Sequence, residues 1–199
     1  MSNIAQLSLH PRTLDTAEGR AKEVLENAFR QTVDISNMHA AMPNSPALLD
    51  TYLHGYNLFR KESSLTRVEQ ELVFLVISRV NECTYCMATH SMIADVISRT
   101  PAQTVNAIRA DGMIDDPKLR ALAEFTRTMV VSRGRPSEED LDAFQAAGYT
   151  EQNVLDIILA IAVKTISNYT NHLFHTDVDE LLKVCAWISP APERREPTS

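Results

Sequence analysis

Residues 66–90, TRVEQELVFLVISRVNECTYCMATH, decide the fold of this chain. Thr66 and Glu69 have capping-box spacing, which predicts that a helix begins directly after Thr66. The run from Val73 to Val80 is rich in β-branched residues and could be mistaken for a buried strand. We interpret it as a buried helix, because it follows a capping box and its apolar pattern is longer than a typical strand.

The rest of the chain also has helical patterns. Apolar residues at helical spacing predict an amphipathic helix from Thr16, a second from Pro46 with Ser45 as its N-cap, and a long central helix from Thr150. No alternating pattern of the kind that strands show is present, so the predicted fold class is all-α. We expect one domain over residues 1–189 and a flexible, proline-rich tail over 190–199. Further helix starts are expected after Thr100, Asp116 and Ser137, and helix ends at Gly112, Gly134 and Gly148.

Composition and charge argue against several classes of protein. With 199 residues, 44% of them apolar, the chain can bury the core of one soluble domain. A net charge of −7 without a basic cluster argues against nucleic acid and anionic membranes as partners. The first residues lack a signal-peptide pattern, and the longest apolar stretch, Leu155–Val163, is too short to span a bilayer. We therefore expect a cytoplasmic protein, in which a close cysteine pair is more often redox-active or metal-binding than a structural disulfide.

Two cysteines and a histidine lie within eight residues of the opening stretch. On a helix, Cys83 and Cys86 share one face and are close enough to interconvert between dithiol and disulfide, and His90 lies one turn further on. The third cysteine, Cys185, lies in an apolar run and is interpreted as a buried hydrophobic residue. The arrangement is typical of a thiol redox site, with a nucleophile, a resolving thiol and a titratable neighbour.

Glu71 is a candidate base for these thiols, provided that the helix breaks between them. Along one unbroken helix, Glu71 and Cys83 would be ~18 Å apart. The polar pair Asn81-Glu82 lies between two apolar runs and is the natural place for a break. Cys83 would then lie in the first turn of the next helix, where free backbone N–H groups favour a thiolate. On this argument alone, Cys83 is the nucleophile.

The pattern Glu71-x11-Cys83-x2-Cys86-x3-His90 resembles the signature of the alkylhydroperoxidase D (AhpD) branch of the carboxymuconolactone decarboxylase superfamily. The resemblance covers residues 44–109, and the later segment NYTNH at 168–172 is similar to longer, peroxidase-related members. It implies an AhpD-like helical bundle, trimeric or hexameric, that reduces hydroperoxides with its cysteine pair and without a metal or an organic cofactor. The implied partners are a hydroperoxide substrate and a dithiol or protein thiol reductant.

The resemblance also implies a role for each residue of the motif. Cys86 attacks the peroxide and becomes a sulfenic acid, and Cys83 resolves it to a disulfide. Glu71 acts as a base through water, and His90 relays the proton. The chain departs from the founding peroxidase at Tyr85, where that enzyme has a second histidine. A phenol cannot replace imidazole as a base near neutral pH.

Other interpretations of these residues stay open. The cysteines could be buried structural thiols, or zinc ligands together with His90, although structural zinc sites take four ligands. The protein could be a cofactor-free decarboxylase or lactone-processing enzyme, as in the superfamily's other branch, or a redox sensor without catalysis. Core or subunit packing, rather than chemistry, is expected of Tyr52, Tyr56, Phe59 and His172.

Overall fold

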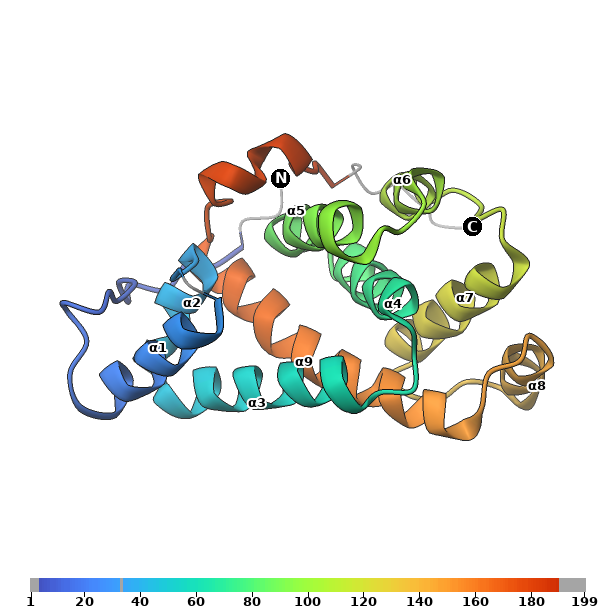
Figure 1. The fold of residues 1–199 in the computed structure, drawn as a ribbon, viewed down its shortest axis with the longest axis horizontal. Coiled ribbons are helices and arrows are strands. Elements are labelled where there is room, and N and C mark those ends of the chain that lie inside the picture. Colours follow the sequence, from blue (N-terminus) through green and yellow to red (C-terminus); the bar gives the residue numbers. More distant parts are fainter. Residues whose placement is uncertain (1–3, 33, 190–199) are drawn as a thin grey trace, which may run out of the picture.

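The computed structural model describes residues 4–32 and 34–189, and within these ranges every regular element is a helix (Figure 1). The predicted all-α class is therefore confirmed, whereas the predicted flexible tail at 190–199 lies outside the described residues. In chain order, the elements are α1 (Gly19–Thr32), α2 (Asn37–Ala41), η1 (Met42–Asn44), α3 (Pro46–Glu62), α4 (Arg67–Val80), α5 (Thr84–Ile93), the π turn η2 (Ala94–Ser98), α6 (Ala102–Ala110), α7 (Pro117–Val131), α8 (Glu138–Ala146), α9 (Glu151–Phe174) and η3 (Glu180–Cys185).

Helix α4 lies at the centre of the molecule. Every residue from Glu69 to Ser78 is buried, because α5, α6, α7 and α9 all pack against this helix. Coverage on all sides explains why the segment is apolar around its circumference rather than amphipathic. The β-branched run is therefore a buried helix and not a strand.

Helix α9 crosses the molecule from α8 to α2 and packs against α3 and α4 (Figure 1). The short η3 segment packs against α5, which is the helix that carries the cysteines. The helices α3, α5 and α9, together with η3, surround the region that holds the cysteines. No helix among residues 4–32 and 34–189 is long and apolar enough to cross a membrane.

Most of the predicted helix starts are present. Complete capping boxes form at Thr66, Ser137 and Thr150. Ser45 and Asp116 are N-caps, each followed by a proline at the start of its helix. The first helix begins three residues later than predicted, at Gly19, because the side chains and backbone of residues 13 and 16 close a separate turn.

Both ends of α6 differ from the prediction. Its N-cap is Pro101 rather than Thr100, because the Thr100 N–H donates to the Ala94 carbonyl at 2.8 Å and belongs to the preceding π turn. At its other end, Asp111 and not Gly112 adopts the left-handed conformation, with a φ of 58°. Asp111 tolerates this conformation better than most residues, and its carboxylate forms an ion pair with Arg127.

Candidate functional site

The helix break that the site requires lies where the sequence predicted it. Glu82 adopts a left-handed φ of 55° between α4 and α5, and Cys83 is the N-cap of α5. Asn81, at the end of α4, donates through Nδ2 to Oδ1 of Asn168 on α9 at 2.9 Å. The turn folds α5 back against α4, and it thereby brings the cysteine helix toward Glu71.

Both motif cysteines are buried free thiols at the start of α5. Cys83 is 0% exposed and Cys86 is 1% exposed, and neither forms a disulfide. Cys86 lies in the first helical turn, where backbone N–H groups have no partner within the helix. Cys185 is half-buried in the surface segment η3, so it is not the fully buried residue that the sequence predicted.

Glu71 and His90 are in direct contact. Glu71 Oε2 lies 2.8 Å from His90 Nδ1. Because an ionised carboxylate only accepts, Nδ1 carries the imidazole proton and Nε2 is left as an acceptor. Glu71 also forms an ion pair with Arg60 of α3, which the sequence analysis did not identify. Arg60 in turn donates to the Tyr56 hydroxyl at 2.9 Å and to Gln70 Oε1 at 3.3 Å.

Burial and charge set the protonation states of this cluster. Burial tends to raise the pKa of Glu71, but the charges and hydrogen bonds of His90 and Arg60 outweigh it, so the net shift in pKa is downward. Burial, together with the charge of Lys164, lowers the pKa of His90 to about 4, against the opposing effect of Glu71. Near neutral pH the cluster therefore holds an ionised Glu71 and a neutral His90.

Helix α9 contributes three polar side chains that the sequence analysis missed. Lys164, Ser167 and Asn171 are buried at helical spacing on one face of α9. Asn171 Nδ2 donates to Cys86 Sγ at 3.4 Å and to Cys83 Sγ at 3.8 Å, and Ser167 Oγ lies 3.8 Å from Cys86 Sγ. Lys164 lines the same cavity as Cys86. The one available signal was a lone lysine within a strongly apolar helix.

These neighbours give the two thiols different acidities. Burial tends to raise the pKa of Cys86, but a hydrogen bond from Cys83 and the charge of Lys164 lower that pKa well below the value of an ordinary thiol. The hydrogen bond with Cys86 raises the pKa of Cys83, and burial raises it further. This ordering favours Cys86 as the thiolate, whereas position on the helix alone favoured Cys83.

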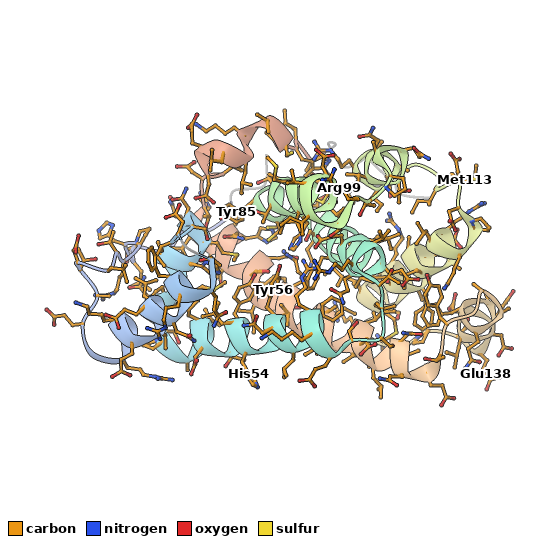
Figure 2. The ribbon with its side chains drawn as sticks, in the orientation of Figure 1. His54, Tyr56, Tyr85, Arg99, Met113 and Glu138 are labelled. Atoms are coloured by element: carbon orange, nitrogen blue, oxygen red, sulfur yellow. The ribbon has the colours of Figure 1, made fainter. Side chains whose placement is uncertain are left out.

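Cys86 and His90 line a cavity of about 420 Å³. Tyr56 is directed from α3 into the interior, whereas His54 on the same helix points outward (Figure 2). Tyr52 and Tyr56 therefore line the site instead of serving only as core or subunit contacts, because the inner face of α3 borders this cavity. Other apolar residues of its wall are Met38, Leu53, Ile93, Leu181 and Leu182.

Tyr85, where the chain departs from the family pattern, connects three elements beside the cavity. Its hydroxyl donates to the carboxylate of Asp179, which directly precedes η3. Asp179 Oδ1 also accepts from the backbone N–H of Asn37 on α2 at 2.9 Å. Burial raises the pKa of Tyr85, so the phenol stays protonated and continues to donate. These contacts hold η3 and α2 against the cysteine helix.

His172 lies apart from the thiols. It is half-buried, stacks on Tyr169 at 6.4 Å between ring centroids, and does not line the cavity. In the NYTNH segment it is Asn168 and Asn171, not His172, that contact the cysteine region. Among the described residues, no group of three or more His, Cys, Asp or Glu side chains is placed to hold a metal ion.

Comparison with known proteins gives a similarity to one family over part of the chain, and a shared fold. The profile of the carboxymuconolactone decarboxylase family matches residues 46–128, which include Glu71, Cys83, Cys86 and His90. A search of curated proteins found no significant match.

Three solved structures illustrate the shared fold. An uncharacterized peroxidase-related protein with an alkylhydroperoxidase AhpD core, from Ralstonia eutropha JMP134, is 18% identical with a TM-score of 0.74, and the alignment covers 92% of this chain and 96% of that chain. A cysteine-to-alanine variant of the debrominase Bmp8 in complex with 2,3,4-tribromopyrrole is 16% identical with a TM-score of 0.70, covering 90% and 96%. A peroxidase-related protein from Silicibacter sp. TM1040 is 18% identical with a TM-score of 0.69, covering 91% and 95%. Residues 46–128 are therefore similar to the carboxymuconolactone decarboxylase family, and the chain has the fold of the AhpD-like, peroxidase-related structures.

Proposed function

We propose that the protein is a thiol-dependent hydroperoxide reductase. The observation that carries this proposal is the buried Cys83–Cys86 pair, whose more acidic member, Cys86, shares a cavity wall with the Glu71-bound His90. The superfamily and its similar structures support a peroxidase-related or a decarboxylase-like enzyme. The cysteine pair favours the first of these, because a cofactor-free decarboxylation has no need of two redox-active thiols.

The reaction proceeds in three chemical steps. The Cys86 thiolate attacks the terminal oxygen of the hydroperoxide, an S–O bond forms as the O–O bond breaks, and the leaving alkoxide takes a proton to become an alcohol. The Cys83 thiol attacks the sulfenic sulfur, and its proton leaves with the departing hydroxide as water. A dithiol reductant then reduces the disulfide by two exchanges and is itself oxidised. His90, held by Glu71 in the tautomer with a free Nε2, relays the Cys83 proton.

Consumption of cumene hydroperoxide with dithiothreitol as the reductant tests the proposal. We expect turnover by the parent protein and none by Cys86→Ser, which lacks the nucleophile. Cys83→Ser should also lose turnover but should still form a sulfenic acid that dimedone traps, because only the resolving thiol is missing. Cys185→Ser is the matched control and should keep the parent rate, since this thiol lies in η3.

Mass spectrometry with thiol trapping gives a second test. Treatment with one equivalent of peroxide should remove the Cys83 and Cys86 thiols together and leave Cys185 reduced. A disulfide that contains Cys185 contradicts the proposal. A parent protein that forms the Cys83–Cys86 disulfide without catalytic turnover is a redox sensor, and one that consumes no peroxide at all leaves the decarboxylase-like function as the better account.

A second candidate is reductive debromination of a flat ring. The specific observation is the aromatic wall of Tyr52 and Tyr56 beside Cys86, in a fold that the debrominase Bmp8 also adopts. Cys86 would take bromine from the ring as the ring carbon takes a proton, and Cys83 would then displace bromide to form the disulfide. Bromide release from 2,3,4-tribromopyrrole with dithiothreitol tests this candidate, and its absence in a preparation that turns over peroxide eliminates it.

A further inference from the structure

Lys164 is a buried cation without a carboxylate partner. The residue is 1% exposed, and its Nζ lies 5.4 Å from the centre of the Phe74 ring. Within the described residues, the ammonium takes part in no hydrogen bond and no ion pair. A charge buried in this way is unfavourable unless an opposite charge lies nearby.

Two carboxylates near the cavity already have partners. Glu71 is held by Arg60, and Asp179 accepts a hydrogen bond from Tyr85. The acid that remains on the cavity wall with Lys164 is the Cys86 thiol.

Helix α9 brings Lys164 to the side of the site where Cys86 of α5 lies. Ser167, one turn after Lys164, donates to the Lys164 carbonyl at 3.2 Å, and its Oγ lies 3.8 Å from Cys86 Sγ. Phe74, beneath the ammonium, also packs on His90 at 4.8 Å between ring centroids. The ammonium, the imidazole and the thiol therefore share one small cavity.

The other titratable groups that face this cavity do not supply a balancing charge near neutral pH. Tyr52 and Tyr56 on α3 stay protonated, because burial raises the pKa of each phenol. His39 on α2 and His90 on α5 stay neutral, because burial lowers the pKa of each to about 4. Asp34 is exposed at the cavity wall, where water screens its charge.

We infer that Lys164 forms an ammonium–thiolate pair with Cys86 and gives its proton to the alkoxide that leaves when Cys86 attacks a hydroperoxide. The pairing is a property of the reduced protein, whereas the proton donation rests on the proposed reductase function.

The proton balance closes over one catalytic cycle. The resting site holds the Lys164 ammonium, the Cys86 thiolate and the Cys83 thiol. The leaving alkoxide takes the ammonium proton and departs as an alcohol, and disulfide formation then releases water with the Cys83 proton. The oxidised site therefore holds a neutral Lys164 amine. This amine accepts a proton from the incoming dithiol as its sulfur attacks Cys83 and displaces the Cys86 thiolate, and the second reductant thiol then releases Cys83 as a thiol.

The pH dependence of alkylation at Cys86 by iodoacetamide, without peroxide, tests the pairing. In Lys164→Met the thiol loses its counter-ion, so the alkylation profile should move to higher pH. A thiol with an ordinary pKa near 8.5 is only about 1% ionised at pH 6.5, so the rate there should fall by between ~10-fold and ~100-fold. Lys164→Arg should restore the profile, because the positive charge is kept. Lys22→Met, an exposed lysine on α1, is the matched control and should leave the profile unchanged.

Peroxide turnover by Lys164→Arg tests the proton donation. A guanidinium holds its proton too tightly to give it up in each cycle, so this variant should alkylate like the parent and yet turn over hydroperoxide at least ~10-fold more slowly. Parent-like turnover by Lys164→Arg overturns the donation, and parent-like alkylation by folded Lys164→Met overturns the pairing. If Lys164→Met does not fold, the absorbance of the thiolate at 240 nm decides instead. At pH 6.5 the parent must absorb more than Cys86→Ser at this wavelength, and equal absorbance overturns the pairing. A parent protein that consumes no peroxide defeats the reductase proposal and the donation, while the alkylation profiles still decide the pairing.

Discussion

Glu71 contacts both Arg60 and His90, so its replacement has two separable consequences. In Glu71→Gln the shape is kept, but Arg60 loses its counter-ion, and breaking a buried ion pair costs about 3–5 kcal/mol. His90 also loses the carboxylate that fixes its tautomer, so peroxide turnover should slow by ~10²–10⁴-fold.

Urea unfolding and the turnover assay measure these two effects independently. The double variant Glu71→Gln/Arg60→Met removes the unpaired guanidinium, so it should recover much of the lost stability and none of the turnover. Unchanged unfolding midpoints in Glu71→Gln would show that the ion pair is not important for the fold. From the sequence alone, Glu71 was expected to act as a base for the thiols, and Arg60 was not recognised as its partner.

Spacing along the chain reports only those site residues that are close in sequence. Cys83, Cys86 and His90 share one helix, and Glu71 could be added because a helix break at Asn81-Glu82 has a recognisable composition. The α9 residues Lys164, Ser167 and Asn171 reach the same thiols from more than 70 positions away. No local pattern specifies how α9 crosses α5, so the residues that set thiol acidity could not be predicted.

At the scale of elements, a hydrogen bond between Asn81 and Asn168 connects the turn between α4 and α5 to α9. Asn168→Ala leaves the Asn81 amide without its acceptor, which should lower the free energy of unfolding by about 1 kcal/mol. Disulfide formation between Cys83 and Cys86 should also slow, because the start of α5 is less firmly held. Gln152→Ala, at an exposed position on the same helix, is the control for both measurements. Parent-like rates and stability in Asn168→Ala would contradict the importance of this contact.

Helix starts were predicted better than helix ends. A capping box is a local hydrogen-bonded motif, so Thr66, Ser137 and Thr150 could be identified from three or four residues. The end of α6 is formed instead by Asp111, which also pairs with Arg127 16 residues away, whereas the sequence pattern assigned this end to Gly112. The all-α class was predictable because it requires only the period of the apolar pattern.

At the scale of the whole molecule, buried histidines make stability depend on pH. Burial lowers the pKa of His39 and His90 from 6.5 to about 4, so between these values the unfolded chain binds more protons than the folded one. The contribution of the histidines to stability is therefore full above pH 6.5 and falls as the pH drops toward 4, by about 1.4 kcal/mol for each pKa unit of each histidine.

Urea unfolding at pH 7.5, 6.5, 5.5 and 4.5 measures this slope. Cys86, whose pKa is also lowered, adds to the same fall in stability. The histidine contribution is therefore taken from the difference between the parent and His39→Gln. Because this variant lacks the buried His39 of α2, its free energy of unfolding should depend less steeply on pH. Parallel slopes in the two proteins would show that His39 is not neutral in the folded state.

We expect the protein to form homo-oligomers, which the family resemblance implies to be trimers or hexamers. Leu155, Ile158, Tyr169 and Leu173 are 65%, 48%, 55% and 39% exposed and form one stripe along the outer face of α9. A continuous apolar stripe of this kind is typical of a surface that another protein covers. Light scattering should give a multiple of 22.3 kDa, and Ile158→Lys should shift that mass toward the monomer. A parent protein that is already a monomer contradicts this expectation.

The burial of both thiols has a consequence for the choice of electron donor. Cys83 and Cys86 are 0% and 1% exposed, and residues of η3 line the cavity beside Cys86, so we expect the protein to distinguish electron donors by their size. A small dithiol can diffuse into a cavity of about 420 Å³, and its rate should rise in proportion to concentration. A protein dithiol can reach the cysteines only after η3 moves away from the cavity. Its rate should therefore saturate, with increasing concentration, at the rate at which η3 opens. Tyr85→Phe removes one of the contacts that hold η3 in place. It should raise the saturating rate of reduction by the protein dithiol and leave the rate with the small dithiol almost unchanged.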